Sequence, residues 1–274
     1  MKNSKVKITI NPMKNAVVLL DMNVTSVSII DKLVNKFPNE NICYINDFEY
    51  GEYEGHDPSD IKSRIKKILE FIKNNQPKML YVLNSVFIEY GEEVFDDLGF
   101  PVYNIVKTIV DYVNTKYEYK NIAFLANDGM IDANIYQKAF RYSHLYNCKV
   151  NELIDVANKK LMKTKESFNA VRDIAIGLAK KEIDIIVTPE INLLLLYTEF
   201  GEYFKDVELV RTDEAVLATF ESELNKFDNN ASPDKVKDVN VFMYFNTPDM
   251  YREDDAFRKL VKANYAILDY SIKK

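Results

Sequence analysis

The feature that most constrains this chain is the alternation of short apolar runs with longer amphipathic stretches. The short runs are rich in β-branched and aliphatic residues and predict strands, whereas the longer stretches repeat apolar residues with helical period. Strands interleaved with helices form largely parallel sheets, so we predict an α/β fold. The predicted strands span residues 16–21, 42–47, 78–83, 101–105, 121–126, 148–153, 183–188, 206–210 and 239–245.

Two of the predicted helices carry start signals. Asp57 precedes Pro58, and Thr247 precedes Pro248, which is the order of a capping side chain followed by the residue preferred at the first helical position. Apolar residues at helical spacing then predict the face that each helix buries. These residues are Ile61, Ile65, Ile68 and Ile72 in the first helix, and Phe257, Leu260 and Val261 in the second, which we expect to follow the last strand.

Composition and charge exclude several classes of partner. The chain has 274 residues, 47% hydrophobic and 28% charged, with a formal net charge of −6, so no overall basic field favours nucleic acid or an anionic membrane. No apolar run has the ~20 residues that a membrane span needs, and we expect a cytoplasmic protein. The two cysteines, Cys43 and Cys148, have no metal-ligand spacing, and we expect neither a metal nor a disulfide.

Polar side chains follow several of the predicted strands. Because open α/β sheets place reacting groups at the carboxyl ends of strands, these residues are candidates for a functional site. Each also has a purely structural interpretation, as a helix cap, as the residue that ends a strand, or as an anion in a first helical turn. The candidates are Asp21, Asn84, Ser85, Asn127, Glu190 and Asn192.

Several segments also match the motifs of a known family in order and spacing. They are DMNVTSV at 21–27, the loop with Asp47 and Tyr53, FPVYNIVK at 100–107, ANIYQKAF at 133–140, ELVRTDEAV at 208–216 and VFMYFNTPDMYREDDAFRKL at 241–260. In this order the chain resembles the glutamate racemases, of the aspartate/glutamate racemase superfamily, over roughly residues 15–265.

The resemblance implies a particular organisation. It predicts two pseudo-symmetric domains, each a mainly parallel sheet flanked by helices, with a cleft between them. The first domain would comprise residues 1–111 plus 222–274, and the second residues 112–221. It further implies a homodimer, no cofactor and no metal.

The family's chemistry requires two thiols, one on each side of the substrate α-carbon, to remove and return its proton. The first belongs to a Cys-Asn-Thr motif, which here reads Leu83, Asn84, Ser85. The second belongs to Gly-Cys-Thr-His, and the matching residues are 189–192, with Glu190 at the thiol and Asn192 at the histidine. Both thiols are therefore absent from this chain.

The positions that bind substrate in the family are also altered. The Gly-Val-Gly-Gly turn has become residues 23–26, NVTS, Met22 replaces a serine, and Met130 replaces a threonine. The substrate-binding positions carried over by the resemblance are Asp21, Met22, Asn84, Ser85, Asn127, Met130 and Asn192.

Three functions remain open. The first is a catalytically inactive glutamate racemase-like protein retained for binding, assembly or regulation, which would fit a protein partner as well as a homodimer. The second is an isomerase or lyase acting on an amino or dicarboxylic acid, with Glu190 and Asp21 as acid and base. The third is a sensor of a small ligand that uses the same cleft without turnover.

Overall fold

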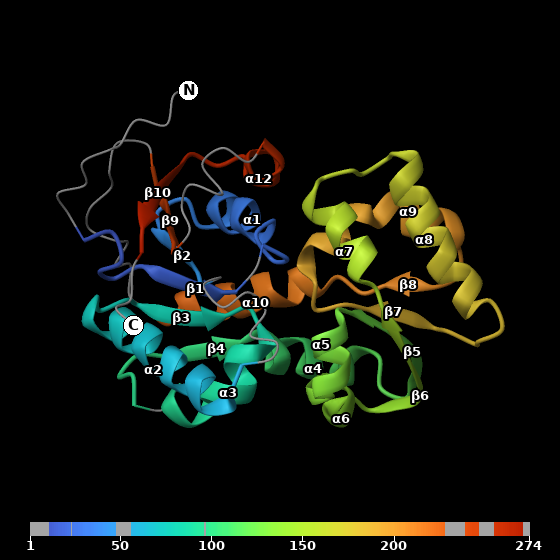
Figure 1. The fold of residues 1–274 in the computed structure, drawn as a ribbon, viewed down its shortest axis with the longest axis horizontal. Helices are drawn as coiled ribbons and strands as arrows, with labels where there is room; N and C mark the ends of the chain where they lie inside the picture. The colour runs from blue at the N-terminus through green and yellow to red at the C-terminus, as the bar shows by residue number, and fades with distance from the viewer. Residues whose placement is uncertain are drawn as a thin grey trace. The chain divides into compact units, whose positions relative to one another are not determined.

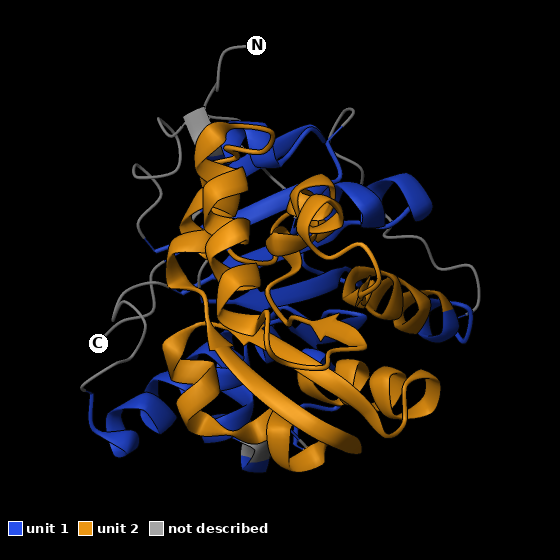
Figure 2. Cartoon of the chain, turned by 90° about the vertical axis from the view of Figure 1, so that its right-hand side faces the viewer, with its two compact units in different colours: residues 1–24, 30–105, 222–274 blue, residues 25–29, 106–221 orange. Residues whose placement is uncertain are grey.

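The computed structural model describes residues 11–22, 24–47, 56–95, 97–227, 239–246 and 255–270 (Figure 1). Asn23, Tyr53, Thr247 and Pro248 lie outside these ranges, so the predicted start of the second helix is not described. Contacts between Cα atoms divide the chain into two compact units (Figure 2). Unit 1 comprises residues 1–24, 30–105 and 222–274, and unit 2 comprises residues 25–29 and 106–221.

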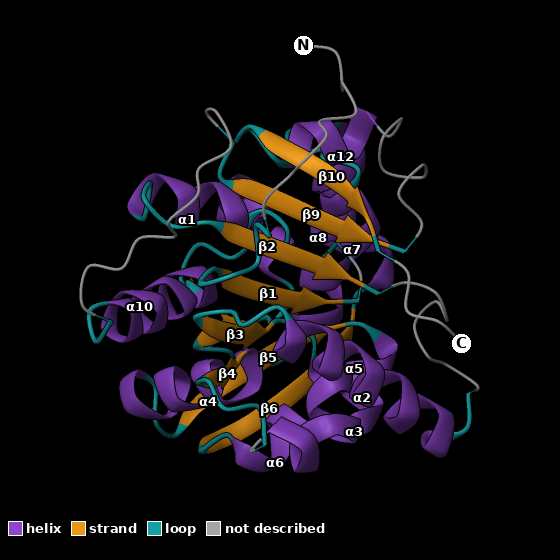
Figure 3. Ribbon diagram, turned by 90° about the vertical axis from the view of Figure 1, so that its left-hand side faces the viewer, coloured by secondary structure: helices purple, strands orange, loops and turns teal. Residues whose placement is uncertain are grey.

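Unit 1 contains a six-stranded parallel sheet in the order β10-β9-β2-β1-β3-β4 (Figure 3). Strands β1, β2, β3 and β9 are buried along their whole length, as expected for a parallel sheet covered on both faces. The elements are β1 (Val17–Asp21), α1 (Ile29–Lys36), β2 (Ile42–Asn46), α2 (Pro58–Asn74), β3 (Met79–Val82), α3 (Ser85–Phe95), β4 (Val102–Asn104), β9 (Val241–Phe245), α12 (Asp255–Leu260) and β10 (Tyr265–Asp269).

Unit 2 contains a four-stranded parallel sheet in the order β6-β5-β7-β8. Its elements are α4 (Ile105–Lys116), β5 (Lys120–Ala126), α5 (Asp128–Ala133), α6 (Ile135–Ala139), β6 (Tyr142–Lys149), α7 (Asn151–Asn158), α8 (Lys165–Leu178), β7 (Ile185–Val187), the 3-10 helix η1 (Ile191–Leu196), α9 (Tyr197–Tyr203), β8 (Glu208–Leu209) and α10 (Thr212–Leu224), which runs into unit 1. The predicted α/β class with two parallel, helix-flanked sheets is confirmed.

Helix α2 forms as its sequence predicts. The Asp57 side chain accepts a 2.8 Å hydrogen bond from the Ser59 N–H, Pro58 occupies the first helical position, and the predicted isoleucine stripe is buried. Helix α3 packs closely against this stripe at Gly91, where a Cβ atom would lie 2.8 Å from Cγ2 of Ile65. The short side chain therefore permits the approach of the two helices.

Two predictions about strands are wrong. Residues 148–153 do not form the sixth strand: β6 is Tyr142–Lys149, and Asn151 already begins α7. Strand β9 is not the last, because β10 follows α12. Both β6 and β10 lie at the edge of their sheets and are only partly buried; β6 mixes polar with apolar residues, whereas β10 begins with the short apolar run YAIL, which was not among the predicted strands. In α12, the predicted burial of Phe257, Leu260 and the following Val261 is confirmed.

The domain boundaries expected from the sequence stay a prediction. A division by contacts identifies compact units, whereas a domain is a part of the chain that can fold by itself.

Candidate functional site

The segment that matches the first thiol motif directly follows β3. The Leu83 N–H donates to the Leu20 carbonyl at 2.8 Å, which extends the pairing of β3 with β1, and the Leu83 side chain is 2% exposed. Asn84 precedes α3, and its Oδ1 accepts a 2.9 Å hydrogen bond from the Val86 N–H. Asn84 therefore caps the helix. The buried Leu83 side chain is a hydrocarbon and has no exchangeable proton.

Asp21 is fully buried at the carboxyl end of β1. Its Oδ1 accepts from the Met22 N–H at 2.8 Å, and its Oδ2 accepts from the Tyr44 hydroxyl at 3.1 Å. Leu19 pairs with Tyr44 in the parallel register, so Asp21, two residues later, lies on the same face as Tyr44. The carboxylate is thus held by donors from its own turn and from the neighbouring strand, β2.

A buried ion pair fixes the end of β2. The Arg64 guanidinium contacts both carboxylate oxygens of Asp47, with Nε to Oδ2 at 2.9 Å and Nη2 to Oδ1 at 2.6 Å. The Asn246 amide, after β9, donates to the same Oδ1 at 3.1 Å. Both charged side chains are at most 2% exposed, so the pair joins α2 to the carboxyl ends of two strands.

Sequence reasoning missed Tyr44 and Arg64. A signal for Arg64 was present, because it lies between Ile61 and Ile68 at helical spacing, within the apolar face of α2. A charged residue on such a face needs a buried partner, and Asp47 is that partner. No comparable signal marks Tyr44, whose hydroxyl finds Asp21 only through the pairing of β1 with β2.

In unit 2, Glu190 and Asn127 are joined at the ends of β7 and β5. Nδ2 of Asn127 donates to Oε1 of Glu190 at 2.9 Å, and Oδ1 of Asn127 accepts from the Met130 N–H at 2.8 Å, capping α5. The Glu190 N–H donates to Oγ1 of Thr188 at 3.1 Å. Glu190 is 1% exposed, and Met130 is 6% exposed.

Asn192 holds three parts of unit 2 together. Its N–H donates to the Thr25 carbonyl at 2.8 Å, its Oδ1 accepts from the Ser28 N–H at 3.0 Å, and its Nδ2 donates to Oδ1 of Asn158 at 2.8 Å. These bonds fasten residues 25–29 and α7 to the start of η1. The buried amide therefore has a structural use at the position that matches the family's histidine.

The predicted site residues thus form two groups. Asp21, Met22, Leu83, Asn84 and Ser85 lie at the ends of the paired strands β1 and β3 in unit 1 and are buried. The residues after the paired strands β5 and β7 in unit 2 are Asn127, Met130, Glu190 and Asn192. The cleft between the domains, and an acid/base pair of Asp21 with Glu190, stay predictions.

The two cysteines lie on strands, apart from the site residues predicted from the sequence. Cys43 is buried inside β2, where its Sγ donates to the Pro12 carbonyl at 3.4 Å, and burial raises the pKa of this thiol strongly. Cys148 lies on β6, and burial raises its pKa to about 11. Among the described residues, no group of three His, Cys, Asp or Glu side chains is arranged to hold a metal ion.

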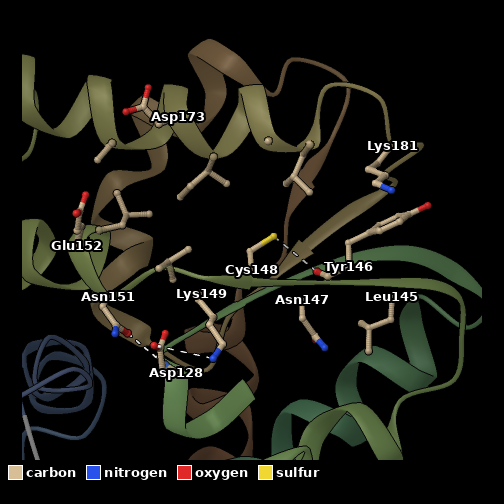
Figure 4. A pocket seen from close by; sticks show the side chains of 16 residues that line it. Asp128, Leu145, Tyr146, Asn147, Cys148, Lys149, Asn151, Glu152, Asp173 and Lys181 are labelled. Carbon is tan, nitrogen blue, oxygen red and sulfur yellow. Dashed lines mark hydrogen bonds and ion pairs between the residues drawn. The ribbon is translucent and has the colours of Figure 1, made fainter. Parts of the chain in front are cut away.

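A cavity of about 770 Å³ lies elsewhere in unit 2, beside β6 and beneath α8 (Figure 4). It is lined by parts of β6, α7 and α8 together with Asp128, and by none of the site residues predicted from the sequence. Within the ranges that the structure describes, no helix is long and apolar enough to cross a membrane.

In comparisons with known proteins, the chain is similar in sequence to glutamate racemases. No protein-family model matches it. It is 22% identical to glutamate racemase 3 of Caldanaerobacter subterraneus subsp. tengcongensis, over 62% of this chain and 63% of that protein, which is less than two thirds of its length. It is 21% identical to the glutamate racemase of Lactobacillus acidophilus, over 72% of this chain and 75% of that protein.

Solved structures agree in fold. A glutamate racemase isoform from Bacillus anthracis has a TM-score of 0.75 at 20% identity, covering 95% of this chain and 98% of that one. The glutamate racemase of Thermus thermophilus, in complex with β-chloro-D-alanine, has a TM-score of 0.76 at 15% identity with the same coverage. By sequence this chain is therefore a homologue of the glutamate racemases, and its fold is that of the aspartate/glutamate racemase superfamily.

Proposed function

We propose that this chain is a glutamate racemase-like protein without racemase activity, retained for a binding, assembly or regulatory role. Racemisation requires one group to remove the α-proton and a second group to return a proton on the opposite side. Leu83 and Glu190 occupy the positions that match the two thiols, and a leucine side chain has no proton to exchange. At most one of the two proton-transferring groups, the carboxylate of Glu190, therefore remains.

The observation that carries this proposal is the structural use of the remaining polar side chains. Asn84 caps α3, and Asn192 fastens residues 25–29 and α7 to η1. Asp21 accepts from Tyr44, and Glu190 accepts from Asn127. Each of these side chains has a partner within its own unit, so stability alone accounts for keeping it.

A second candidate function rests on the burial of two carboxylates. Asp21 is 0% exposed and Glu190 is 1% exposed, and burying an ionisable carboxyl group is costly. Such groups are frequent at functional sites. An isomerase or lyase acting on an amino or dicarboxylic acid, with Glu190 and Asp21 as acid and base, would use them, and a sensor of such a ligand would bind it through the same groups.

Hydrogen–deuterium exchange at the α-carbon separates the inactive protein from the altered enzyme. Purified protein is incubated with D- and L-glutamate and D- and L-aspartate in heavy water, and loss of the α-proton signal is followed by NMR. We expect no exchange above the rate in buffer, while an active glutamate racemase exchanges glutamate under the same conditions. Exchange that disappears in Glu190→Gln or Asp21→Asn would establish the altered enzyme instead.

A thermal-shift screen tests the sensor. A ligand that binds only the native state raises the melting temperature, and at a concentration of 100 times its Kd it adds about 2.7 kcal/mol of stability. We expect amino acids and dicarboxylic acids to leave the melting temperature unchanged. A shift that is lost in Asp21→Asn would favour the sensor.

We further propose a cytoplasmic, homo-oligomeric protein that uses no cofactor and has a protein as its partner. The acidic net charge of −6 supports a partner that is neither nucleic acid nor an anionic membrane.

A further inference from the structure

Strand β6 is one of the two edges of the sheet in unit 2, and β8 is the other. Strand β6 pairs with β5 on one side, and no other strand of the described chain pairs with it. With eight residues it is the longest strand of that sheet, it contains no proline, and Tyr142, Ser143, His144 and Asn147 are exposed. Long exposed edge strands are templates for pairing with another chain.

The backbone of β6 is oriented for such pairing. The Val150 N–H donates to the Ala126 carbonyl at 3.1 Å, and in a parallel ladder alternate residues face the same neighbouring strand. The backbone N–H and C=O groups of Tyr146 and Cys148 therefore point toward β5. The corresponding groups of Leu145 and Asn147 point toward the open edge. A partner strand would satisfy these groups.

The cavity of about 770 Å³ provides room on one face of this edge. Figure 4 shows Cys148 pointing from β6 toward the helix that carries Asp173, which is α8, and Tyr146 pointing toward Lys181, while Leu145 and Asn147 point away from that helix. Directly opposed residues in an antiparallel pair share a face. Side chains of an added strand can therefore enter the space beneath α8.

Charge along β6 favours a second copy of the same strand in antiparallel orientation. Arg141, Lys120 and Lys181 surround its beginning and middle, with Glu118 as the carboxylate that pairs with Arg141. The end of β6 is acidic instead. Asp128 and Asp132 lie around Lys149, and Glu152 follows it in the sequence. A twofold axis brings the beginning of one strand to the end of the other, so each basic end meets an acidic one.

Exposed tyrosines extend the same surface. Tyr119 is 68% exposed and Tyr142 is 38% exposed, and the Tyr119 N–H donates to the Arg141 carbonyl at 2.9 Å, so both rings lie where β5 and β6 begin. Tyrosine and arginine are enriched in protein interfaces. We propose that two copies of this chain form a dimer by antiparallel pairing of their β6 strands. This dimer does not depend on whether the racemase-like site is inactive.

Sedimentation velocity of the full chain over a concentration series tests the proposal, with Asn147→Pro as the disrupting variant. The ring removes an N–H that faces the open edge, a place where a strand tolerates proline. We expect the wild type to dimerise and Asn147→Pro to remain monomeric with an unchanged circular dichroism spectrum. A wild type that is monomeric at every concentration overturns the proposal.

Charge reversal gives a second test that does not rely on proline. Arg141→Glu and Asp132→Lys should each raise the dimer Kd about tenfold, or ~1.4 kcal/mol, because the twofold axis makes each substitution remove two exposed charge pairs of ~0.7 kcal/mol. The double variant should recover because its ends are complementary again. Lys66→Glu, on the exposed face of α2, is the matched control and should leave the Kd unchanged. A dimer that both single reversals leave intact, or that Lys66→Glu weakens equally, overturns the proposal. If Asn147→Pro fails to fold, this series decides.

Discussion

Asn127 is bonded to Glu190 across the ends of β5 and β7: its amide caps α5 and donates to Glu190 at 2.9 Å. The Glu190 carboxylate is therefore held within the framework of unit 2.

Glu190→Gln should change the stability by less than about 1 kcal/mol, because the amide oxygen still accepts from Asn127. Glu190→Ala should cost ~1–3 kcal/mol, since the Asn127 donor then lacks this buried acceptor. Urea unfolding of the purified variants measures both. Equal stability of Glu190→Ala and the wild type would show that the bond has no structural role.

Arg64→Ala should be among the most destabilising single changes. It leaves the buried Asp47 carboxylate without its guanidinium partner, and breaking a buried pair in this way costs ~3–5 kcal/mol. Lys107→Ala, which removes the exposed Lys107–Asp111 pair, is the control and should stay within about 0.5 kcal/mol. Similar midpoints of chemical unfolding for the two variants would contradict this prediction.

Asn192→Ala should loosen the segment 25–29. The Ser28 N–H loses its 3.0 Å acceptor, so we expect its amide to exchange with solvent roughly 30-fold faster, for a loss of ~2 kcal/mol. Asn158→Ala removes only the partner of Asn192 Nδ2 and should leave the protection of Ser28 nearly unchanged. Amide exchange followed by NMR distinguishes the two variants, and equal protection in both would count against this role of Asn192.

Asn84→Ala should cost about 1 kcal/mol, as expected for the loss of a capping side chain, whereas Asn84→Asp should retain most of the stability because its carboxylate also accepts from Val86. Thermal unfolding of the two variants measures the difference. A larger loss in Asn84→Asp than in Asn84→Ala would exclude the capping role.

Cys148 should react slowly with thiol reagents at neutral pH. Burial raises its pKa to about 11 from an ordinary value of 9.0, so about 100-fold less thiolate is present at pH 7 than for an ordinary thiol. Since the folded state holds the proton more tightly, the stability contributed by Cys148 is complete below pH 9 and falls as the pH rises toward 11. Between these pH values, the free energy of unfolding of Cys148→Ser should fall less than that of the wild type. A labelling rate at neutral pH equal to that of the unfolded chain would contradict the prediction.

Local signals in the sequence were sufficient for helix α2. The cap at Asp57, the proline after it and the isoleucine stripe lie within one helix, and each acts on residues a turn away. The same holds for the central strands, whose apolar runs are buried on both faces whatever their neighbours are. Strand β6 was misplaced because it mixes polar with apolar residues and depends on its pairing with β5, whereas β10 was missed although its first four residues, YAIL, are apolar.

For the site residues too, sequence and tertiary structure provide different information. The sequence by itself predicts that Leu83 and Glu190 match the positions of the family's thiols, because colinear motifs require no knowledge of contacts, and this match stays a prediction. Only the tertiary structure decided what the surrounding polar groups bind. Tyr44 reaches Asp21, Asn127 reaches Glu190, and Arg64 reaches Asp47 across strands or helices far apart in sequence. Hydrogen bonds act over about 3 Å, and that proximity arises only when the sheets form.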